Sequence, residues 1–430
     1  MEDSVDSSRL SVAERIARAE AVAPEQRAAT AKRPILYAEA VYDERAIEAV
    51  VDVLRHRRHA LMNGPAVREF ETRIAALFGK QHGIMVNSGS SANLLAVASL
   101  ELPAGAEVVT PALTFATTVA PLLQCGLVPA FVDVTPDSYV VDLEQVEAMI
   151  GPKTRALMIP NLLGNLPDWA ALRAMAAHRH LQVIEDSADT LGALFNGQPT
   201  GELSDIATTS FYASHVLTAG GFGGMVCTND QRVAERARLL RGWGRSSALS
   251  GESEAVDERL NVEVDGVPYD SKFVFLAVGF NFLPSELGAA FGLQQCLDLA
   301  AFIRNRIDNF QRLRAFFAQH ERWFMLPRQD PRVRTAWLAF PLLIRPDAPF
   351  SRRDLQLHFE RDGIQTRTIF TGNILRQPGF ARIPRKETAG GYPNADAVMQ
   401  RGLLIGCHHG LSAADIERMC EAFTEFARRF

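Results

Sequence analysis

Between residues 83 and 228 the chain carries seven short runs of β-forming residues: GIMV at 83–86, EVVTP at 107–111, PAFVDV at 129–134, ALMIP at 156–160, LQVIED at 181–186, IATTSF at 206–211 and GGMVCT at 223–228. Helical patterns separate these runs. This alternation predicts an α/β fold with a mainly parallel sheet that is covered on both faces. Ligands of such sheets bind beyond the carboxyl ends of the strands, so the polar residues after each run are the candidate site residues.

Helical segments flank this region. Residues 43–58, DERAIEAVVDVLRHRR, begin with the N-cap candidate Asp43 and then place apolar residues at helical spacing. Residues 285–317 predict a long helix that links two domains. We therefore expect an N-terminal helical arm over residues 1–35, a large domain over 36–300 and a small domain over 301–430.

Composition limits the class of protein. The 430 residues are 47% hydrophobic and 22% charged, which is typical of globular domains with substantial cores. The formal net charge of −5 provides no basic field, so we expect neither nucleic acid nor a membrane as partner. The five cysteines form no CxxC pair, and no secretory signal or membrane-spanning apolar run is visible. These features predict a cytoplasmic protein with free thiols.

The first motif is NSGSSAN at residues 87–93, which follows a predicted strand and opens a helical pattern. Free backbone N–H groups at the start of a helix bind anions, and the serine hydroxyls add further hydrogen-bonding groups. A serine at such a position is more often a structural cap. The motif alone therefore does not establish a phosphate site.

Two further motifs follow the fifth and sixth runs. In VIEDSAD at residues 183–189, a carboxylate at a strand end could bind a metal, a sugar or a protonated ring nitrogen. A metal is disfavoured because no His or Cys stands at ligand spacing. The third motif is TSFYASH at residues 209–215, followed by GGFGG at residues 220–224. A single histidine in such a motif is more often structural than catalytic.

Together and in this order, the motifs resemble the fold-type I pyridoxal phosphate enzymes, specifically the DegT/DnrJ/EryC1/StrS family of sugar aminotransferases and dehydratases. The segment GFNFLPSELGAAFGLQQ at residues 279–295 matches a fourth family motif, and the resemblance extends from about residue 36 onward. It implies a large domain with a mainly parallel seven-stranded sheet and a smaller α+β C-terminal domain.

The resemblance also implies cofactor contacts. Residues at the ends of two strands would hold the cofactor phosphate: Gly89, Ser90, Ser91 and Ser210. Phe115 would stack on the cofactor ring, Asp186 would pair with the ring nitrogen and Asp189 would bond to the phenolic oxygen. Asn281 would reach the cofactor phosphate of a neighbouring subunit, which implies a homodimer.

The family's aminotransferases carry a lysine at the position of His215, and that lysine forms an imine with the cofactor. The chain has five lysines, and none of them stands in this segment. Family members with histidine here are 3-dehydratases of nucleotide-linked 4-keto-6-deoxyhexoses, enzymes of deoxysugar biosynthesis. A neutral imidazole, with an ordinary pKa of about 6.5, can act as a base but cannot capture the cofactor aldehyde. We therefore expect His215 as catalytic base and non-covalent pyridoxal and pyridoxamine 5′-phosphate. The resemblance to dehydratases of this branch without an iron–sulfur cluster implies glutamate as amino donor.

Two segments resemble the dehydratases near their substrate: PNLLGNLP at residues 160–167 and TRTIFTGN at residues 366–373. They point to Asn161, Arg367 and Asn373 as residues that bind the nucleotide sugar. A surface ion pair is the alternative for Arg367. We favour a guanidinium that faces the diphosphate.

Some dehydratases of this branch hold an iron–sulfur cluster on four cysteines, several of them in a loop after a segment like RGWGR at residues 241–245. No cysteine lies between Cys227 and Cys296, so we expect no such cluster and no bound metal. Two alternatives stay open. One is a sugar-nucleotide aminotransferase-like enzyme with an unusual proton relay, and the other is a non-catalytic sensor or partner subunit that binds the cofactor.

Overall fold

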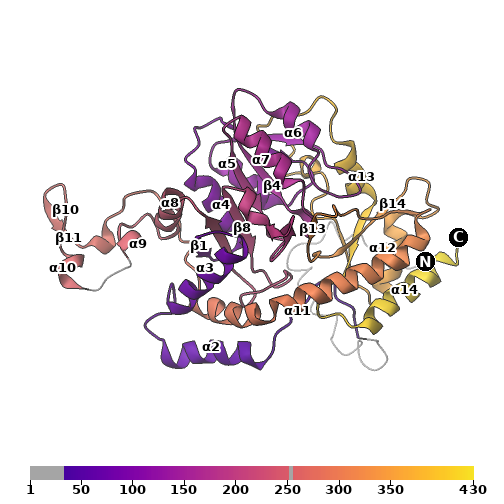
Figure 1. Ribbon diagram of the computed structural model, residues 1–430, viewed down its shortest axis with the longest axis horizontal. Helices are drawn as coiled ribbons and strands as arrows, with labels where there is room; N and C mark the ends of the chain where they lie inside the picture. The colour runs from indigo at the N-terminus through magenta and orange to yellow at the C-terminus, as the bar shows by residue number, and fades with distance from the viewer. Residues whose placement is uncertain (1–32, 251–254) are drawn as a thin grey trace, which may run out of the picture.

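The computed structural model describes residues 33–250 and 255–430. Its central feature is a seven-stranded sheet built from the seven predicted runs (Figure 1). The strands are β1 (His82–Val86), β2 (Glu107–Pro111), β3 (Val128–Val132), β4 (Thr154–Pro160), β5 (Gln182–Asp186), β8 (Ile206–Ser210) and β9 (Gly224–Thr228). They lie in the order β1-β9-β8-β5-β4-β2-β3, and only β9 runs against the others. The predicted mainly parallel α/β fold is confirmed.

Helices cover both faces of this sheet because neighbouring residues of a strand point to opposite sides. Met158 of β4 packs in the cluster of one face, and Leu157 packs in the cluster of the other. The first face is covered by α4 (Gly89–Ser99), α5 (Ala116–Gln124) and α8 (Gln231–Arg241). The second face is covered by α3 (Pro65–Leu77), α6 (Leu143–Met149), α7 (Trp169–His178) and α11 (Glu286–Phe317).

The two helices predicted outside the sheet region are present. Asp43 caps α2 (Glu44–His56) by accepting a hydrogen bond from the backbone N–H of Arg45. Ser285 caps α11, which continues for 32 residues without a break. Figure 1 shows α11 running from beneath the main sheet to the C-terminal part of the chain. The predicted boundary at residue 300 therefore falls inside a helix that both domains share.

The C-terminal part is a small α+β domain. Its four-stranded antiparallel sheet has the order β12 (Phe324–Met325), β14 (Phe340–Ile344), β16 (Gly402–Ile405) and β15 (Thr366–Thr368). Its helices are α12 (Arg352–Arg361), α13 (Pro393–Arg401) and α14 (Ala413–Ala427). Capping boxes at Ser351 and Ser412 start α12 and α14.

The predicted N-terminal arm is only partly within the described residues. Residues 1–32 of that arm lie outside them. Residues 33–35 are extended instead of helical, because Ile35 pairs with Ile364 and donates its N–H to the carbonyl oxygen of Gly363. This short segment therefore packs on the small domain.

Shorter elements complete the fold. A small sheet joins β6 (Leu194–Phe195), β7 (Gln198–Pro199) and β13 (Val333–Arg334). Single turns of 3₁₀ helix are η3 (Leu162–Gly164), η4 (Thr200–Leu203), η5 (Ser271–Phe273), η6 (Ala318–His320) and η7 (Ile374–Arg376). Within the described ranges, no helix combines the length and the hydropathy needed to cross a membrane.

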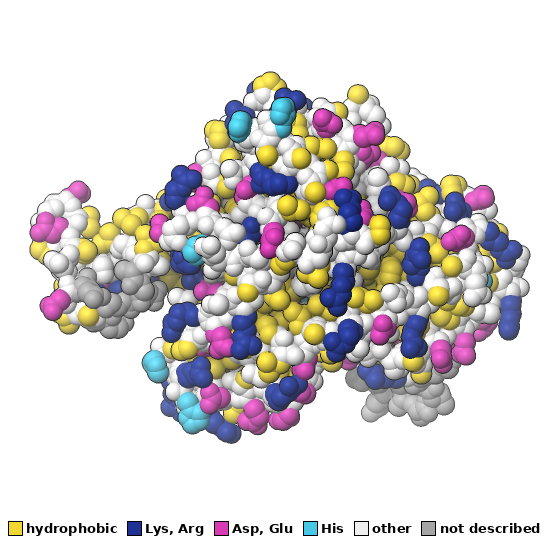
Figure 2. All heavy atoms as spheres, in the orientation of Figure 1, with side chains coloured by type: hydrophobic (Ala, Val, Ile, Leu, Met, Phe, Trp, Pro, Cys, Tyr) yellow, Lys and Arg dark blue, Asp and Glu magenta, His cyan; other side chains and the backbone are white. Residues whose placement is uncertain are grey.

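One arm extends away from the body of the molecule (Figure 1). It consists of α9 (Ser247–Ser250), α10 (Val256–Arg259), β10 (Val262–Val264) and β11 (Val267–Tyr269). Figure 2 shows hydrophobic side chains gathered on it. The large hydrophobic side chains exposed there and just after it are Leu249, Val256, Leu260, Val264, Val267, Tyr269, Phe273, Phe275, Leu276 and Val278. Such a patch is unusual on a surface that faces only water.

Candidate active site

A cavity of about 940 Å³ opens beyond the carboxyl ends of β5 and β8 and reaches the small domain. Its position is the one that the sheet topology favours for a ligand. The sequence-predicted residues that line it are Gly89, Ser90, Phe115, Asn161, Asp186, Asp189, Ser210, His215 and Arg367. The fold thus brings together residues that are up to 278 positions apart.

The start of α4 provides an anion site on one side of the cavity. Ser88 caps the helix by accepting a hydrogen bond from the Ser91 N–H at 3.1 Å, and Ser90 faces the cavity. A Cβ at Gly89 would lie 2.5 Å from Cβ of Ser210, so only glycine lets the helix start this close to β8. The start of α4, where the first N–H groups have no partner within the helix, therefore lies close to the Ser210 hydroxyl. Ser91 does not line the cavity, and its hydroxyl accepts a hydrogen bond from Oγ of Ser88 at 3.0 Å.

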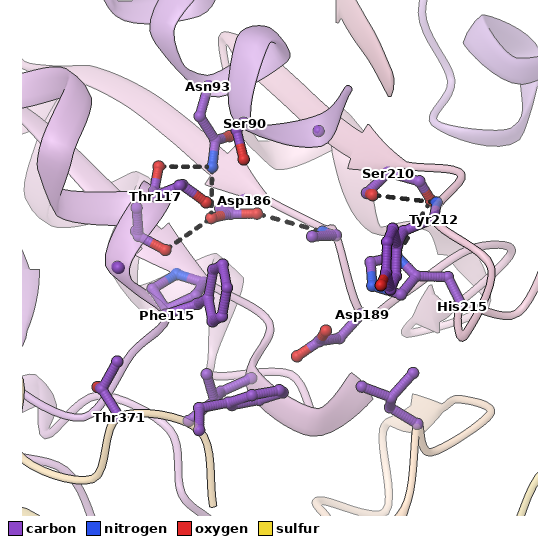
Figure 3. A pocket seen from close by; sticks show the side chains of 18 of the residues that line it. Ser90, Asn93, Phe115, Thr117, Asp186, Asp189, Ser210, Tyr212, His215 and Thr371 are labelled. Atoms are coloured by element: carbon purple, nitrogen blue, oxygen red, sulfur yellow. Dashed lines mark hydrogen bonds between the residues drawn. The ribbon is translucent and has the colours of Figure 1, made fainter. Parts of the chain in front are cut away.

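Asp186 stands at the end of β5 with its carboxylate fixed by three donors (Figure 3). Its Oδ2 accepts hydrogen bonds from Nδ2 of Asn93 and Oγ1 of Thr118, both at 2.8 Å, and its Oδ1 accepts from the N–H of Ala188 at 3.2 Å. Burial raises the pKa of this carboxyl, whereas the three donors oppose that change. The arrangement suits a carboxylate that pairs with a buried cationic ring nitrogen.

Asp189 faces the same cavity, and its Oδ2 accepts a hydrogen bond from the Leu163 N–H at 2.9 Å (Figure 3). Burial raises its pKa to about 7. The Leu163 N–H acts in the opposite direction, and the nearby Asp186 adds to the increase. This carboxyl can therefore gain or lose a proton near neutral pH.

The tautomer of His215 follows from its hydrogen bond. Nδ1 lies 3.2 Å from the carbonyl oxygen of Ser210, which can only accept, so Nδ1 carries the proton. Nε2 has no hydrogen-bond partner among the described residues and keeps a free lone pair in the neutral ring. Burial lowers the His215 pKa to about 4, the Ser210 carbonyl opposes this, and Arg306 lowers it further. The ring is thus in its basic, uncharged form at neutral pH.

Arg367 of β15 contributes a positive charge from the small domain. Its guanidinium lies 5.7 Å from the centre of the Tyr37 ring and donates to the Thr366 carbonyl oxygen at 2.7 Å. No other lysine or arginine among the described residues lines the cavity. An anionic group that enters from this side would meet Arg367 first.

The remaining predicted residues are placed differently. Asn373 is buried outside the cavity lining and donates to Asp396 at 2.8 Å. Asn281 is exposed and pairs through its backbone with Gly242, also outside this cavity. Asn161 lines the cavity, but its amide bonds to three other side chains: Glu185, Ser187 and Trp169.

Sequence reasoning missed the two side chains that hold Asp186. Asn93 belongs to the NSGSSAN motif, and Thr118 stands three residues after Phe115, but neither received a role. A polar signal was present for Asn93, because asparagine, a poor helix former, stands inside a predicted helical pattern. The structure buries it within α4. Three aromatic side chains also line the cavity: Tyr37, Tyr212 and Phe370. No feature of the sequence indicated that they would lie there.

Metal ligands do not gather elsewhere in the described parts of the chain. No group of three or more His, Cys, Asp or Glu side chains there could hold a metal ion. All five cysteines are unpaired, and they are spread over three of the hydrophobic clusters of the two domains.

The cavity residues fit a planar, phosphorylated pyridine. The start of α4 can bind a phosphate, and the Asp186 carboxylate can pair with a protonated ring nitrogen. Phe115 is half-exposed at the cavity and can stack on an aromatic ring. Fold and site together define the class of fold-type I pyridoxal phosphate-dependent enzymes.

The model of the DegT/DnrJ/EryC1/StrS aminotransferase family matches residues 41–424, and the chain belongs to this family. The dTDP-4-dehydro-2,6-dideoxy-D-glucose 3-dehydratase of Saccharopolyspora spinosa is 35% identical over 407 residues, which are 92% of this chain and 87% of that protein. The structure of GDP-4-keto-6-deoxy-D-mannose-3-dehydratase from E. coli with bound hydrated PLP has a TM-score of 0.81 and 27% identity, and covers 92% of this chain and 100% of that one. The structure of GDP-4-keto-6-deoxymannose-3-dehydratase with a trapped PLP-glutamate geminal diamine has a TM-score of 0.81 and 25% identity. It covers 90% of this chain and 99% of that one.

We predict that Asp189→Asn stabilises the cofactor-free protein at pH 8. A carboxyl whose pKa rises from 3.8 to about 7 on folding binds more protons when folded, so its contribution to stability falls as pH rises across that range. Asparagine keeps an acceptor for Leu163 without the charge. We expect a gain of about 1–3 kcal/mol in the free energy of unfolding at pH 8, measured with urea, and little gain near pH 4. A gain that is largest at acidic pH would contradict this assignment.

Proposed function

We propose that the chain is a 3-dehydratase that removes the C3 hydroxyl of a nucleotide-linked 4-keto-6-deoxyhexose, with pyridoxal and pyridoxamine 5′-phosphate bound non-covalently. One observation carries the proposal: the cavity is lined by His215 and by no lysine of the described residues. The family includes aminotransferases by its description, and relatives that this chain matches are 3-dehydratases by name. The histidine favours the second activity.

The cofactor, when bound, supplies an amine and an aromatic ring that accepts electrons from a neighbouring carbon. Its phosphate would be held by the start of α4 with Ser90 and Ser210. Phe115 would cover one ring face, and the Asp186 carboxylate would keep the ring nitrogen protonated. Asp189 would bond to the phenolic oxygen. Glutamate is the proposed amino donor, because one related 3-dehydratase structure holds a trapped PLP-glutamate geminal diamine.

His215 would move the proton. Its Nε2 lone pair is free because Nδ1–H is held by Ser210, and the lowered pKa keeps the ring uncharged at neutral pH. Once Nε2 has accepted a proton, the same lowered pKa makes the imidazolium ready to return it to the departing hydroxyl. No primary amine stands at this position to fix the cofactor aldehyde.

The product distinguishes this activity from amino transfer. A dehydratase driven by glutamate releases one ammonia for each 2-oxoglutarate and forms a 3-deoxy-4-keto sugar, whereas an aminotransferase forms an amino sugar and releases no ammonia. We predict ammonia and 2-oxoglutarate in equal amounts, measured by coupled assays together with mass spectrometry of the sugar. His215→Asn should lower this turnover by about 10²- to 10⁴-fold.

Three results would count against the proposal. An amino sugar as the main product would favour the aminotransferase alternative. Cofactor binding without turnover of any nucleotide-linked keto sugar would favour a sensor or partner subunit. Faster dehydration by His215→Lys than by the natural protein would exclude His215 as the base.

Arg367 is the proposed contact for the substrate diphosphate, since the other cavity-lining charges near it are carboxylates. We predict that Arg367→Gln raises KM for the nucleotide sugar by about 10-fold or more, because a charge-assisted hydrogen bond contributes about 1.5–3 kcal/mol. Arg385→Gln serves as control, since Arg385 pairs with Glu387 outside the cavity lining. Equal KM values for the two variants would remove Arg367 from the substrate site.

A homodimer is proposed from the exposed Asn281 and from the hydrophobic side chains on the arm that carries β10 and β11 (Figure 2). A second subunit would cover this apolar surface and bring its Asn281 to the neighbouring cofactor phosphate. Light scattering should give about twice the chain mass of 47.3 kDa. An active species of single-chain mass would contradict the dimer.

A further inference from the structure

Arg306 lies inside α11, and its side chain is completely buried. Its guanidinium joins both domains. Nη2 donates to the carbonyl oxygen of His215 at 3.3 Å, on the loop after β8. Nε donates to Nδ1 of His409 at 3.1 Å, and Nη1 donates to the carbonyl oxygens of Trp337 and Leu338 at 3.3 and 3.0 Å, all on the small domain.

None of these four acceptors is a carboxylate, and Arg306 forms no ion pair with the other described residues. A buried cation without an anionic partner is expensive, because burial removes its hydration and no opposite charge replaces it. A purely structural link between the domains could be made by neutral side chains at a lower cost. The position of the charge, directly behind His215, therefore calls for a functional explanation.

The other titratable groups around Arg306 are uncharged. Burial, followed by the charge of Arg306, lowers the pKa of His408 to about 4 and that of His409 to about 2. Burial likewise raises the pKa of the Cys407 thiol and of the Tyr37 phenol, which both lie near Arg306. On the cavity side, the charge of Asp189 raises the pKa of Tyr37 further, whereas the charge of Arg367 lowers it. Among the described residues near His215, Arg306 is the cation that donates a hydrogen bond to the His215 backbone.

The His409 ring supports the same description. Its Nδ1 accepts from Arg306, so the proton of the neutral ring is on Nε2, and this buried Nε2 has no hydrogen-bond partner. Phe302 of α11 stacks on the ring with centroids 4.1 Å apart. Protonation of Nδ1 would break the bond to Arg306, so His409 remains a neutral acceptor that orients the guanidinium.

We propose that Arg306 is a positioning residue for His215: its hydrogen bond to the His215 carbonyl oxygen fixes the backbone that aims the imidazole at the cavity. The inference rests on the proposed role of His215 as base. It adds that the small domain takes part in the chemistry through Arg306. Of the three small-domain acceptors of Arg306, Leu338 lines the cavity, whereas Trp337 and His409 do not. The base would be misaligned whenever the small domain shifts relative to α11.

The charge effect is tested by NMR on cofactor-free protein with labelled histidine, with the His215 signal assigned by its loss in His215→Asn. In the natural protein the signal should keep its neutral-form shift down to about pH 5, since the pKa is about 4. In Arg306→Gln the midpoint should move up while staying below the ordinary value of about 6.5, because burial still lowers the His215 pKa. In Arg306→Lys, which keeps the charge, the midpoint should stay near the natural one. An unchanged midpoint in Arg306→Gln would overturn the charge effect.

The alignment effect is tested by kinetics, and Arg306→Lys suffices if Arg306→Gln does not fold. Lysine cannot span the four acceptors, so kcat should fall by about 10- to 100-fold while KM for the nucleotide sugar stays within about twofold. Arg241→Lys is the matched control, because Arg241 is buried but pairs with Glu71 at 2.7 Å outside the cavity lining. It should lower stability without changing the His215 titration.

An unchanged kcat in Arg306→Lys would overturn the positioning role. A His215 titration that moves equally in Arg241→Lys and Arg306→Gln would overturn the charge effect, because it would report general loosening of the fold. The titration uses neither cofactor nor substrate. Its result therefore stands even if the chain proves to catalyse a reaction other than dehydration.

Discussion

The orientation of the imidazole depends on one hydrogen bond of 3.2 Å, from Nδ1 of His215 to the carbonyl oxygen of Ser210. Ser210 is the last residue of β8, which is held by parallel pairing with β5 and antiparallel pairing with β9. The same pairing places Asp186 opposite Thr208, so the carboxylate and the imidazole are set by one piece of sheet. A lysine at this position has no second nitrogen to make the bond.

Charge is distributed unevenly around the cavity, and the distribution matches a ligand with two different ends. The N-terminus of α4 and Ser210 favour an anion, whereas the buried Asp186 favours a cationic group. Arg367 adds a single positive charge on the small-domain side. A phosphorylated pyridinium and an anionic nucleotide sugar together would neutralise the charges that the chain leaves unpaired.

Much of this arrangement could be predicted from the sequence because it depends on local signals. The strands follow from short apolar runs, α2 and α11 follow from their caps and periodicity, and the strand-end residues follow from the topology of parallel sheets. Other features depend on packing between distant segments. The motif around Asn161 predicts that its amide binds a ligand. In the structure this amide instead accepts a hydrogen bond from Trp169 and donates one to Glu185. Arg306 stands in an ordinary helical pattern that gives no sign of complete burial.

The central claim is that no lysine of this chain holds the cofactor. The direct measurement is the intact mass of the protein after incubation with pyridoxal 5′-phosphate and reduction with borohydride, which makes an imine permanent. We predict an unmodified chain of 47.3 kDa, with all of the cofactor released when the protein is denatured. A chain heavier by one reduced cofactor, with the addition mapped to a lysine by peptide mass spectrometry, would contradict it.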